Sequence, residues 1–505
     1  MNLHKKSWLF ILALISLVYI LLRFWNLTGS CLWFDEIFGV HAAEHDWENL
    51  FRFVAQDLIH PPLFYVLLKI WILVGGESLF WLRFFPVFFS TIALIPLYFL
   101  CRALKLNYAA IALAFAFFAF NGALIKYSQE VRMYAPLVCL SLFSLWLFVR
   151  FLNLGKSFWI LTIVNILLVY MHYFGWLVVV SEVVAILILQ RIKIRQILIM
   201  FGINLIAFVP WIFMVWRAAE TNSGLAQNIG WIARPNIATI FQFIFDLIEP
   251  FYYEASNTDA SSNFYITIPI LLVIITATVF YLSGWRQKDE TEKRDFILLL
   301  ILIKLPLLLI VAASWILPHS IWGTRHLIIV FAPMAIFTAI VLGNIEIKPL
   351  KIGLISLIFL LSVAAFAIQL RMPQPKFIWC GWEDLARNID AGKPQKIYVF
   401  EDLVAYHFWF ALRESDQVQI VKIKDVAGIK EDTAYFLPRG FDKVQTTDEN
   451  GITGERFWIA FRGKEFDLSK PPLRNLTDKG YKIGEPKIFE ARGLKAFLVE
   501  VQKEN

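Results

Sequence analysis

Long apolar runs separated by short polar segments repeat along most of this chain. A helix needs about 20 apolar residues to cross a hydrocarbon core of about 30 Å. The runs therefore predict a polytopic α-helical membrane protein with about eleven transmembrane helices, in which the first helix is retained because its run is too long for a signal-peptide core. The eleven runs cover residues 8–27, 84–102, 107–122, 135–152, 158–172, 174–190, 197–217, 264–284, 297–317, 326–343 and 352–370.

One further apolar stretch, "HPPLFYVLLKIWILVGG" at 60–76, tests the topology. Its fourteen mostly apolar residues would give a helix of about 21 Å, which is too short to cross. If it does not cross, every short basic loop falls on the side of the N-terminal Lys5 and Lys6, as the positive-inside rule requires. If it does cross, the later basic loops change side. We therefore predict that 61–76 is an amphipathic or re-entrant helix in a large first outer loop, and that its proline pair starts it.

The same topology places the remaining polar motifs on the outer face, which would make an active site there outward-facing. The compact loops favour a bacterial inner membrane. The outer motifs are "CLWFDEIFGVHAAEH", "DLIHPPL", "LIKYSQEVRMY", "MHYFG", the loop 218–263 and "LPHSIWGTRH".

The composition changes after about residue 372, where strand-like segments replace the apolar runs. We predict two domains, a transmembrane domain at 1–371 and a small extracytoplasmic α/β domain at 372–505. The segment "PQKIYVFEDLVAYHFWFALRE" predicts a strand and then a helix, and four later segments predict strands. These are "DTAYFLPRG", "RFWIAFRG", "GYKIGEPKIFEA" and "LKAFLVEVQ".

Composition and charge agree with a membrane protein. The chain has 505 residues, of which 59% are hydrophobic and only 17% charged, and its net charge is +7. Because basic residues collect in the predicted inner loops, this charge does not indicate a nucleic-acid partner. The four cysteines have no metal-binding spacing, and Cys101 and Cys139 lie in apolar runs as packing residues.

Two motifs with acidic residues follow the first run. Asp35 and Glu36 in "WFDE" lie among aromatic residues, where a carboxylate can act as a general base or ligand; the alternative is a solvated loop acid or a helix cap. "HAAEH" at 41–45 matches the inverted zinc-protease pattern. A protease would need a third ligand in a soluble fold, so we interpret this motif as an ordinary interfacial helix.

Several polar residues interrupt the apolar runs at the predicted outer face. An arginine can hold phosphate oxygens in a two-pronged fork, so Arg132 and Arg325 could together bind an anion. The alternative for Arg132 is a snorkelling side chain paired with Glu130. The residues of this candidate cleft are Asp57, His60, Lys126, Glu130, Arg132, Tyr134, His172, Tyr173 and Arg325 with its neighbour His326.

Two ionisable residues, Glu182 and Lys304, lie inside predicted spans. Such residues are rare and are usually paired or functional. We predict an ion pair between them; the alternative is a proton or ion relay, as a membrane transporter or lipid flippase would use. The absence of detectable inverted repeats and the clustering of charge at the outer ends disfavour transport.

Four motifs, taken in order, resemble those of the GT-C type membrane glycosyltransferases. They are "WFDE", "D-x-x-HPPL", "SQEVRMYA" and a "TRH" that precedes Pro333. The most similar groups are the protein O-mannosyltransferase-like glycosyltransferase family 39 and the lipid A aminoarabinose transferases. The resemblance covers roughly residues 8–340. It implies a transferase that uses a polyprenyl-phosphate-linked sugar on the outer face of the membrane and inverts at the sugar by single displacement.

The resemblance also implies roles for individual residues. Asp35, with Glu36, would be the catalytic base, and Arg132, with Lys126 and Arg325, would contact the donor phosphate. It requires no cofactor and leaves a divalent metal open. The late motif departs from the Arg-Tyr of many relatives, and the C-terminal domain matches no acceptor class. The acceptor therefore stays open among a lipid, a glycan and a protein.

Overall fold

The structure is a computed structural model that describes residues 2–221, 226–251, 263–372, 376–426, 428–429, 436–439 and 441–504. The chain divides into two compact units. Unit 1 contains residues 1–27, 58–220 and 232–373, and unit 2 contains residues 28–57, 221–231 and 374–505. In this division the first-loop residues 28–57 group with the C-terminal residues.

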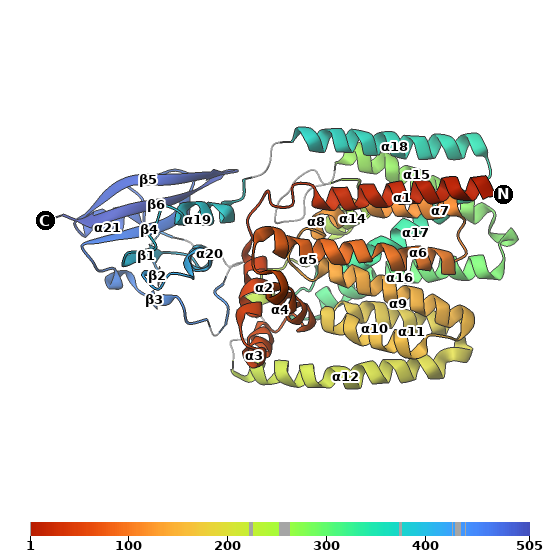
Figure 1. The fold of residues 1–505 in the computed structure, drawn as a ribbon, viewed down its shortest axis with the longest axis horizontal. Helices are drawn as coiled ribbons and strands as arrows, with labels where there is room; N and C mark the ends of the chain where they lie inside the picture. The colour runs from red at the N-terminus through yellow and green to blue at the C-terminus, as the bar shows by residue number, and fades with distance from the viewer. Residues whose placement is uncertain are drawn as a thin grey trace. The chain divides into compact units, whose positions relative to one another are not determined.

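Unit 1 is helical, and its long helices lie side by side along one direction (Figure 1). Its α-helices are α1 (Asn2–Phe24), α4 (Leu63–Gly75), α5 (Leu79–Ile92), α6 (Leu94–Ala103), α7 (Tyr108–Phe120), α8 (Gly122–Tyr127), α9 (Tyr134–Leu154), α10 (Phe158–Met171), α11 (Gly175–Leu189), α12 (Ile194–Thr221), α14 (Ile237–Asp246), α15 (Phe264–Ser283), α16 (Glu290–Ile316), α17 (Phe331–Gly343) and α18 (Lys348–Arg371). Short 3₁₀ helices are η1 (Arg191–Lys193), η2 (Trp285–Gln287) and η3 (His326–Val330).

The prediction of a polytopic membrane protein is confirmed. Among the described residues, 8 helices are long and apolar enough to cross a membrane, counting α5 with α6, η1 with α12, and η3 with α17 as one span each. They correspond to eight of the eleven expected runs. The other three expected runs form the shorter apolar helices α7, α10 and α11.

The stretch 61–76 forms the 13-residue helix α4, which begins directly after Pro62. The helix buries Phe64, Tyr65 and Leu68 and packs against α5 and α10. At 1.5 Å per residue it is about 20 Å long. Its length and its proline start agree with the sequence prediction.

The local sequence explains where several helices of unit 1 begin. The side chains of Asn107 and Asn121 accept backbone N–H groups at the starts of α7 and α8, and Asp289 and Glu292 form a reciprocal capping box at the start of α16. The span 79–103 is divided at Ala93 into α5 and α6. These caps satisfy backbone donors that the apolar helices cannot satisfy themselves.

The predicted ion pair between Glu182 and Lys304 is wrong. The carboxylate of Glu182 is fully buried and is hydrogen-bonded to Ser144 and Asn165, whereas the side chain of Lys304 is exposed on α16. A buried carboxyl group in an apolar bundle needs hydrogen-bond partners, and neutral polar side chains on α9 and α10 supply them.

Unit 2 combines first-loop helices with a mixed α/β layer. Its helices are α2 (Phe34–Glu44), α3 (Trp47–Asp57), α13 (Ala226–Ile229), α19 (Ile378–Ala386), α20 (Asp402–Leu412), η4 (Glu449–Gly451) and α21 (Leu473–Asp478). Its strands are β1 (Gln395–Val399), β2 (Val418–Ile423), β3 (Gln445–Thr447), β4 (Arg456–Gly463), β5 (Tyr481–Ala491) and β6 (Leu494–Lys503).

The six strands form one sheet in the order β3-β2-β1-β4-β6-β5. Strands β3, β2, β1 and β4 are parallel, and β4, β6 and β5 are antiparallel. The predicted strand–helix pair β1–α20 and the predicted strands β4, β5 and β6 are confirmed. Strands β2 and β3 were not predicted, and most of "DTAYFLPRG" lies outside the described residues.

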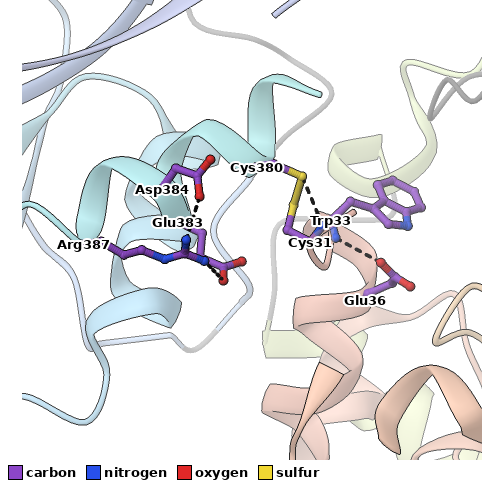
Figure 2. Close-up of a disulfide and its surroundings, with 7 residues drawn as sticks. All are labelled: Cys31, Trp33, Glu36, Cys380, Glu383, Asp384 and Arg387. Atoms are coloured by element: carbon purple, nitrogen blue, oxygen red, sulfur yellow. Dashed lines mark hydrogen bonds and ion pairs between the residues drawn. A yellow bond between two sulfur atoms is a disulfide. The ribbon is translucent and has the colours of Figure 1, made fainter. Parts of the chain in front are cut away.

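A disulfide between Cys31 and Cys380 joins the first-loop segment to α19, with Cα atoms 5.4 Å apart (Figure 2). The two cysteines are 349 residues apart in the sequence, and no local pattern predicts that they pair. Trp33 and Cys31 also pack against the apolar core of unit 2, and the rings of Trp33 and Trp379 lie 6.4 Å apart. The bond therefore fixes the start of α2 to the C-terminal sheet layer.

We expect the double substitution Cys31→Ser, Cys380→Ser to destabilise unit 2 by about 2–5 kcal/mol, because it removes a cross-link that constrains the unfolded chain. Thermal unfolding of the full-length protein in detergent measures the effect. Reductant should lower the melting temperature of wild type and leave that of the variant unchanged. Denatured, unreduced wild type should expose two thiols, those of Cys101 and Cys139; four reactive thiols would contradict the cross-link.

Candidate functional site

Three histidines and an arginine come together in unit 1. Nη2 of Arg132 lies 3.1 Å from Nε2 of His60. The ring centroids of His60 and His172 are 6.0 Å apart, and those of His172 and His326 are 5.0 Å apart. We call His60, Arg132, His172 and His326 the imidazole–arginine cluster. They come from four segments that are distant in the sequence, so the fold of unit 1 assembles the cluster.

Each member of the cluster lies at the end of an apolar helix. His60 precedes α4, Arg132 precedes α9, His172 joins α10 to α11, and His326 opens η3. Residue 323 is a glycine because a Cβ atom on it would lie 2.6 Å from Nδ1 of the His326 imidazole. The polar residues that interrupt the apolar runs thus mark helix ends, where side chains and backbone groups can face a ligand.

The segment before α9 is held by hydrogen bonds to two other helices. Nη1 of Arg83 on α5 donates to the backbone oxygen of Gln129 at 2.6 Å. The Gln129 amide donates to the backbone oxygens of Arg23 and Trp25 at the end of α1, at 3.0 and 2.8 Å. Arg132 itself is only 2% exposed. It is therefore a buried side chain and does not extend to solvent as a snorkelling arginine would.

Protonation in the cluster follows from these contacts. A guanidinium group can only donate, so Nε2 of His60 accepts from Arg132 and the proton of the neutral ring is on Nδ1. Nδ1 of His172 accepts the N–H of Phe174 at 3.0 Å, which leaves the ring proton on Nε2. Burial, assisted by the nearby His60, Arg132 and Arg325, holds the pKa of His172 well below its usual value. The His172 imidazole is therefore neutral at pH 7.

This arrangement is suited to an anion. Arg132 is a permanent cation in a largely buried place, and the positive charges of Arg132 and Arg325 near His172 would favour a negative charge there. A bound phosphate would raise the pKa of His172 again by compensating the nearby cations. The cluster can therefore bind an anionic group and stabilise negative charge that develops on it.

Other residues of the predicted cleft are in unit 1 and have the following surroundings. The Tyr134 ring lies 6.1 Å from that of His326 and 5.1 Å from that of Tyr127. Nζ of Lys126 is 5.2 Å from the centroid of the Tyr127 ring. The hydroxyl of Tyr173 accepts from Nε1 of Trp211 at 3.0 Å. Glu130 is largely buried, and its backbone oxygen accepts the N–H of Arg132. Arg325 directly precedes His326.

The predicted acidic residues are in unit 2. Asp35 is partly buried in the first turn of α2. Glu36 is fully buried, and Oε2 accepts the N–H of Trp33 at 3.1 Å, so it closes the start of α2 as a cap. Asp57, at the end of α3, accepts from the Asn228 amide at 3.2 Å.

The "HAAEH" motif does not form a metal site. Nδ1 of His41 lies 2.9 Å from the hydroxyl of Tyr406, Nδ1 of His45 donates to the backbone oxygen of His41, and Glu44 pairs with Arg413 at 2.9 Å. Among the residues that the structure describes, no group of three His, Cys, Asp or Glu side chains could hold a metal ion. The motif instead joins α2 to α20.

We expect unit 2 to lose stability in acid. Burial, with smaller contributions from His45, Arg413 and Lys443, lowers the pKa of His41 to about 3, and burial lowers the pKa of His407 to about 4. In the unfolded chain both imidazoles titrate near their ordinary value of about 6.5.

Between pH 6.5 and about 4 the unfolded state therefore binds more protons, and stability falls as the pH falls by about 1.4 kcal/mol per pH unit for each histidine. Thermal unfolding at pH 6 and pH 5, both inside this window, measures the dependence of stability on pH, and His41→Gln should reduce the number of protons taken up on unfolding by about one. A slope unchanged in the variant would show that His41 is protonated in the folded protein.

Unit 1 also contains an apolar cavity of about 150 Å³ between α7, α15, α17 and α18. Its walls include Phe117, Ile270, Met334 and Phe359. The helix α17 follows directly from η3, which His326 opens. A cavity with such walls is suited to a hydrocarbon chain.

The fold is shared with known membrane glycosyltransferases. ArnT from Cupriavidus metallidurans bound to undecaprenyl phosphate aligns with a TM-score of 0.58 at 10% identity, and ArnT in the apo state with 0.56 at 11%; each alignment covers 98% of both chains. The oligosaccharyltransferase of Archaeoglobus fulgidus, tethered to an acceptor peptide, aligns with a TM-score of 0.50 at 12% identity. That alignment covers 81% of this chain and 63% of the archaeal protein.

No family model matches this chain, and no curated protein matches it by sequence. The structural likeness confirms the GT-C fold that the sequence motifs indicated. At identities this low the likeness concerns the fold, so the activity has to be argued from the site.

Proposed function

We propose that this protein is a membrane glycosyltransferase that moves a sugar from a polyprenyl-phosphate-linked donor to an acceptor. The observation that carries the proposal is the imidazole–arginine cluster, a buried cationic site at the ends of apolar helices. A lipid-linked phosphate needs such a site beside an apolar bundle. A solved protein of the same fold holds undecaprenyl phosphate, which supports the choice of ligand.

The proposed reaction is a single displacement at the anomeric carbon. An acceptor hydroxyl or amine gives its proton to the carboxylate of Asp35 and forms a bond to that carbon. The bond from the carbon to the phosphate oxygen breaks, and the lipid phosphate leaves with the electron pair as a dianion. Arg132, with Lys126 and Arg325, stabilises that charge. Glu36 supports the start of α2, which carries Asp35.

We propose that the reaction takes place on the outer face of a bacterial inner membrane. A disulfide persists in an oxidising compartment, and the bond between Cys31 and Cys380 joins first-loop and C-terminal residues. The positive-inside pattern puts the same two regions on the outer side. The C-terminal domain is then extracytoplasmic.

The test is sugar transfer by the purified full-length protein in detergent, with a panel of polyprenyl-phosphate sugars and with extracted lipids, glycans and peptides as acceptors. Release of the lipid phosphate and labelling of one acceptor class would establish the enzyme and name both substrates. Transport of the intact donor across vesicles without transfer would instead favour the flippase alternative.

A further inference from the structure

Three polar side chains on three neighbouring helices form a closed ring inside unit 1. Oγ of Ser144 on α9 lies 2.6 Å from Oδ1 of Asn165 on α10 and 2.6 Å from Oε1 of Glu182 on α11. Nδ2 of Asn165 lies 2.7 Å from Oε2 of Glu182 and completes the ring. All three side chains are 0% exposed, so bulk water does not reach the ring.

The ring can be completed only if Glu182 carries a proton. Three contacts at these distances need three hydrogens. The hydroxyl of Ser144 has one, and the amide of Asn165 gives one to the ring while its other hydrogen faces the sulfur of Met200 at 3.6 Å. The third must come from the carboxyl group of Glu182. Exchanging the amide nitrogen and oxygen of Asn165 leaves the count the same.

An ionised Glu182 would put two oxygen lone pairs against each other at 2.6 Å, in a place that offers no cation. The only polar partners of Glu182 within the described part of the chain are Ser144 and Asn165. The side chain of Lys304, the one intramembrane cation that the sequence suggested, is exposed on α16. A neutral carboxylic acid avoids the cost of a buried, unpaired charge.

The ring also has a place in the geometry of the candidate site. Helix α9 begins just after Arg132, and His172 joins the end of α10 to the start of α11. From those ends the ring members are about 9 to 15 Å along their helices, at 1.5 Å per residue. The ring therefore fixes the relative position of the helices that carry Arg132 and His172.

We propose that Glu182 is a protonated positioning residue, which ties α9, α10 and α11 together through Ser144 and Asn165 and so holds Arg132 and His172 in place. Glutamine has one acceptor and one donor in the same shape, so Glu182→Gln preserves all three contacts. Glu182→Ala leaves the hydroxyl of Ser144 and the amide of Asn165 without this partner.

The first test is the infrared difference spectrum between wild type and Glu182→Gln, recorded on the full-length protein at pH 7. The substitution should remove the C=O stretching band of a carboxylic acid and leave the carboxylate bands unchanged. The matched control is Glu401→Gln, because Glu401 is also buried but pairs with Arg462 at 2.6 Å and should lose carboxylate bands. Loss of carboxylate bands in Glu182→Gln would overturn the protonation.

The second test is rescue by the conservative variant. Glu182→Gln should melt within about 2 °C of wild type and Glu182→Ala about 3–8 °C lower, as expected for orphaned buried polar groups. If Glu182→Ala melts at the same temperature as wild type, Glu182 does not tie the three helices together.

The positioning of Arg132 and His172 rests on the proposed function. It predicts that Glu182→Ala weakens binding of undecaprenyl phosphate at least fivefold while Glu182→Gln does not; equal binding by the alanine variant would overturn it. If wild type does not bind this lipid, the proposed function fails, and the infrared and melting results still decide the protonation and the helix tie.

Discussion

Arg132→Ala is expected to reduce sugar transfer by about 10²- to 10³-fold, the usual cost of removing one preorganised donor from a developing negative charge. Arg132 is the buried permanent cation of the cluster, and its contact with His60 holds it there. Arg132→Lys should recover only part of the rate, because an ammonium group cannot form the two-pronged contact of a guanidinium group. The turnover number with a saturating donor is the quantity to measure.

The matched control for this prediction is Arg102→Ala. It removes the same charge from the same unit, but Arg102 is exposed and stacks over Tyr108. Its turnover should stay within about threefold of wild type, as for an exposed residue of little energetic weight. Equal loss in both variants would mean that general charge, and not a site around Arg132, supports the activity.

Asp35→Asn is expected to lower turnover by about 10²- to 10⁴-fold, the range that a positioned general base contributes. Asparagine keeps the size of the side chain and its place in the first turn of α2, so the melting temperature should not change. Donor binding should also be preserved, because the proposed phosphate contacts are made by other residues. Turnover and donor affinity therefore have to be measured on the same samples.

Glu48→Gln is the control for Asp35→Asn, since Glu48 is an exposed acid in unit 2 that pairs with Arg52 on the surface of α3. Exposed ion pairs of this kind contribute little to stability, so the turnover and donor affinity of this variant should equal those of wild type. If Asp35→Asn transfers sugar within threefold of wild type, Asp35 is not the base and another group must take the acceptor proton.

The sequence predicted the helical bundle and most strands of the C-terminal layer, because the spacing of apolar residues and the hydrophobicity of a segment are local properties of the chain. Segments such as "RFWIAFRG" and "LKAFLVEVQ" show β-branched and aromatic residues in short runs, and they form β4 and β6. Strand β3 has only three residues, Gln445–Thr447, and no apolar side chain, so it gave no such signal. It pairs with β2 because the tertiary fold brings the two segments together.

The candidate site was only partly visible in the sequence for the same reason. His60, Arg132 and His172 stood out because each interrupts an apolar run, but nothing local indicates that their side chains meet. The role of Gly323 follows from the space beside His326 and has no signature of its own. The fold also brings together Cys31 and Cys380, which form the disulfide. In the same way it places Ser144 and Asn165, and not the expected Lys304, beside Glu182.

The central claim is that the imidazole–arginine cluster holds a lipid-linked phosphate. The most direct test is to measure the binding of undecaprenyl phosphate to the full-length protein by native mass spectrometry in detergent. Wild type and Arg102→Ala should bind one molecule with equal affinity, and Arg132→Ala should bind at least tenfold more weakly. Equal binding by Arg132→Ala, or no specific binding by wild type, would contradict the claim.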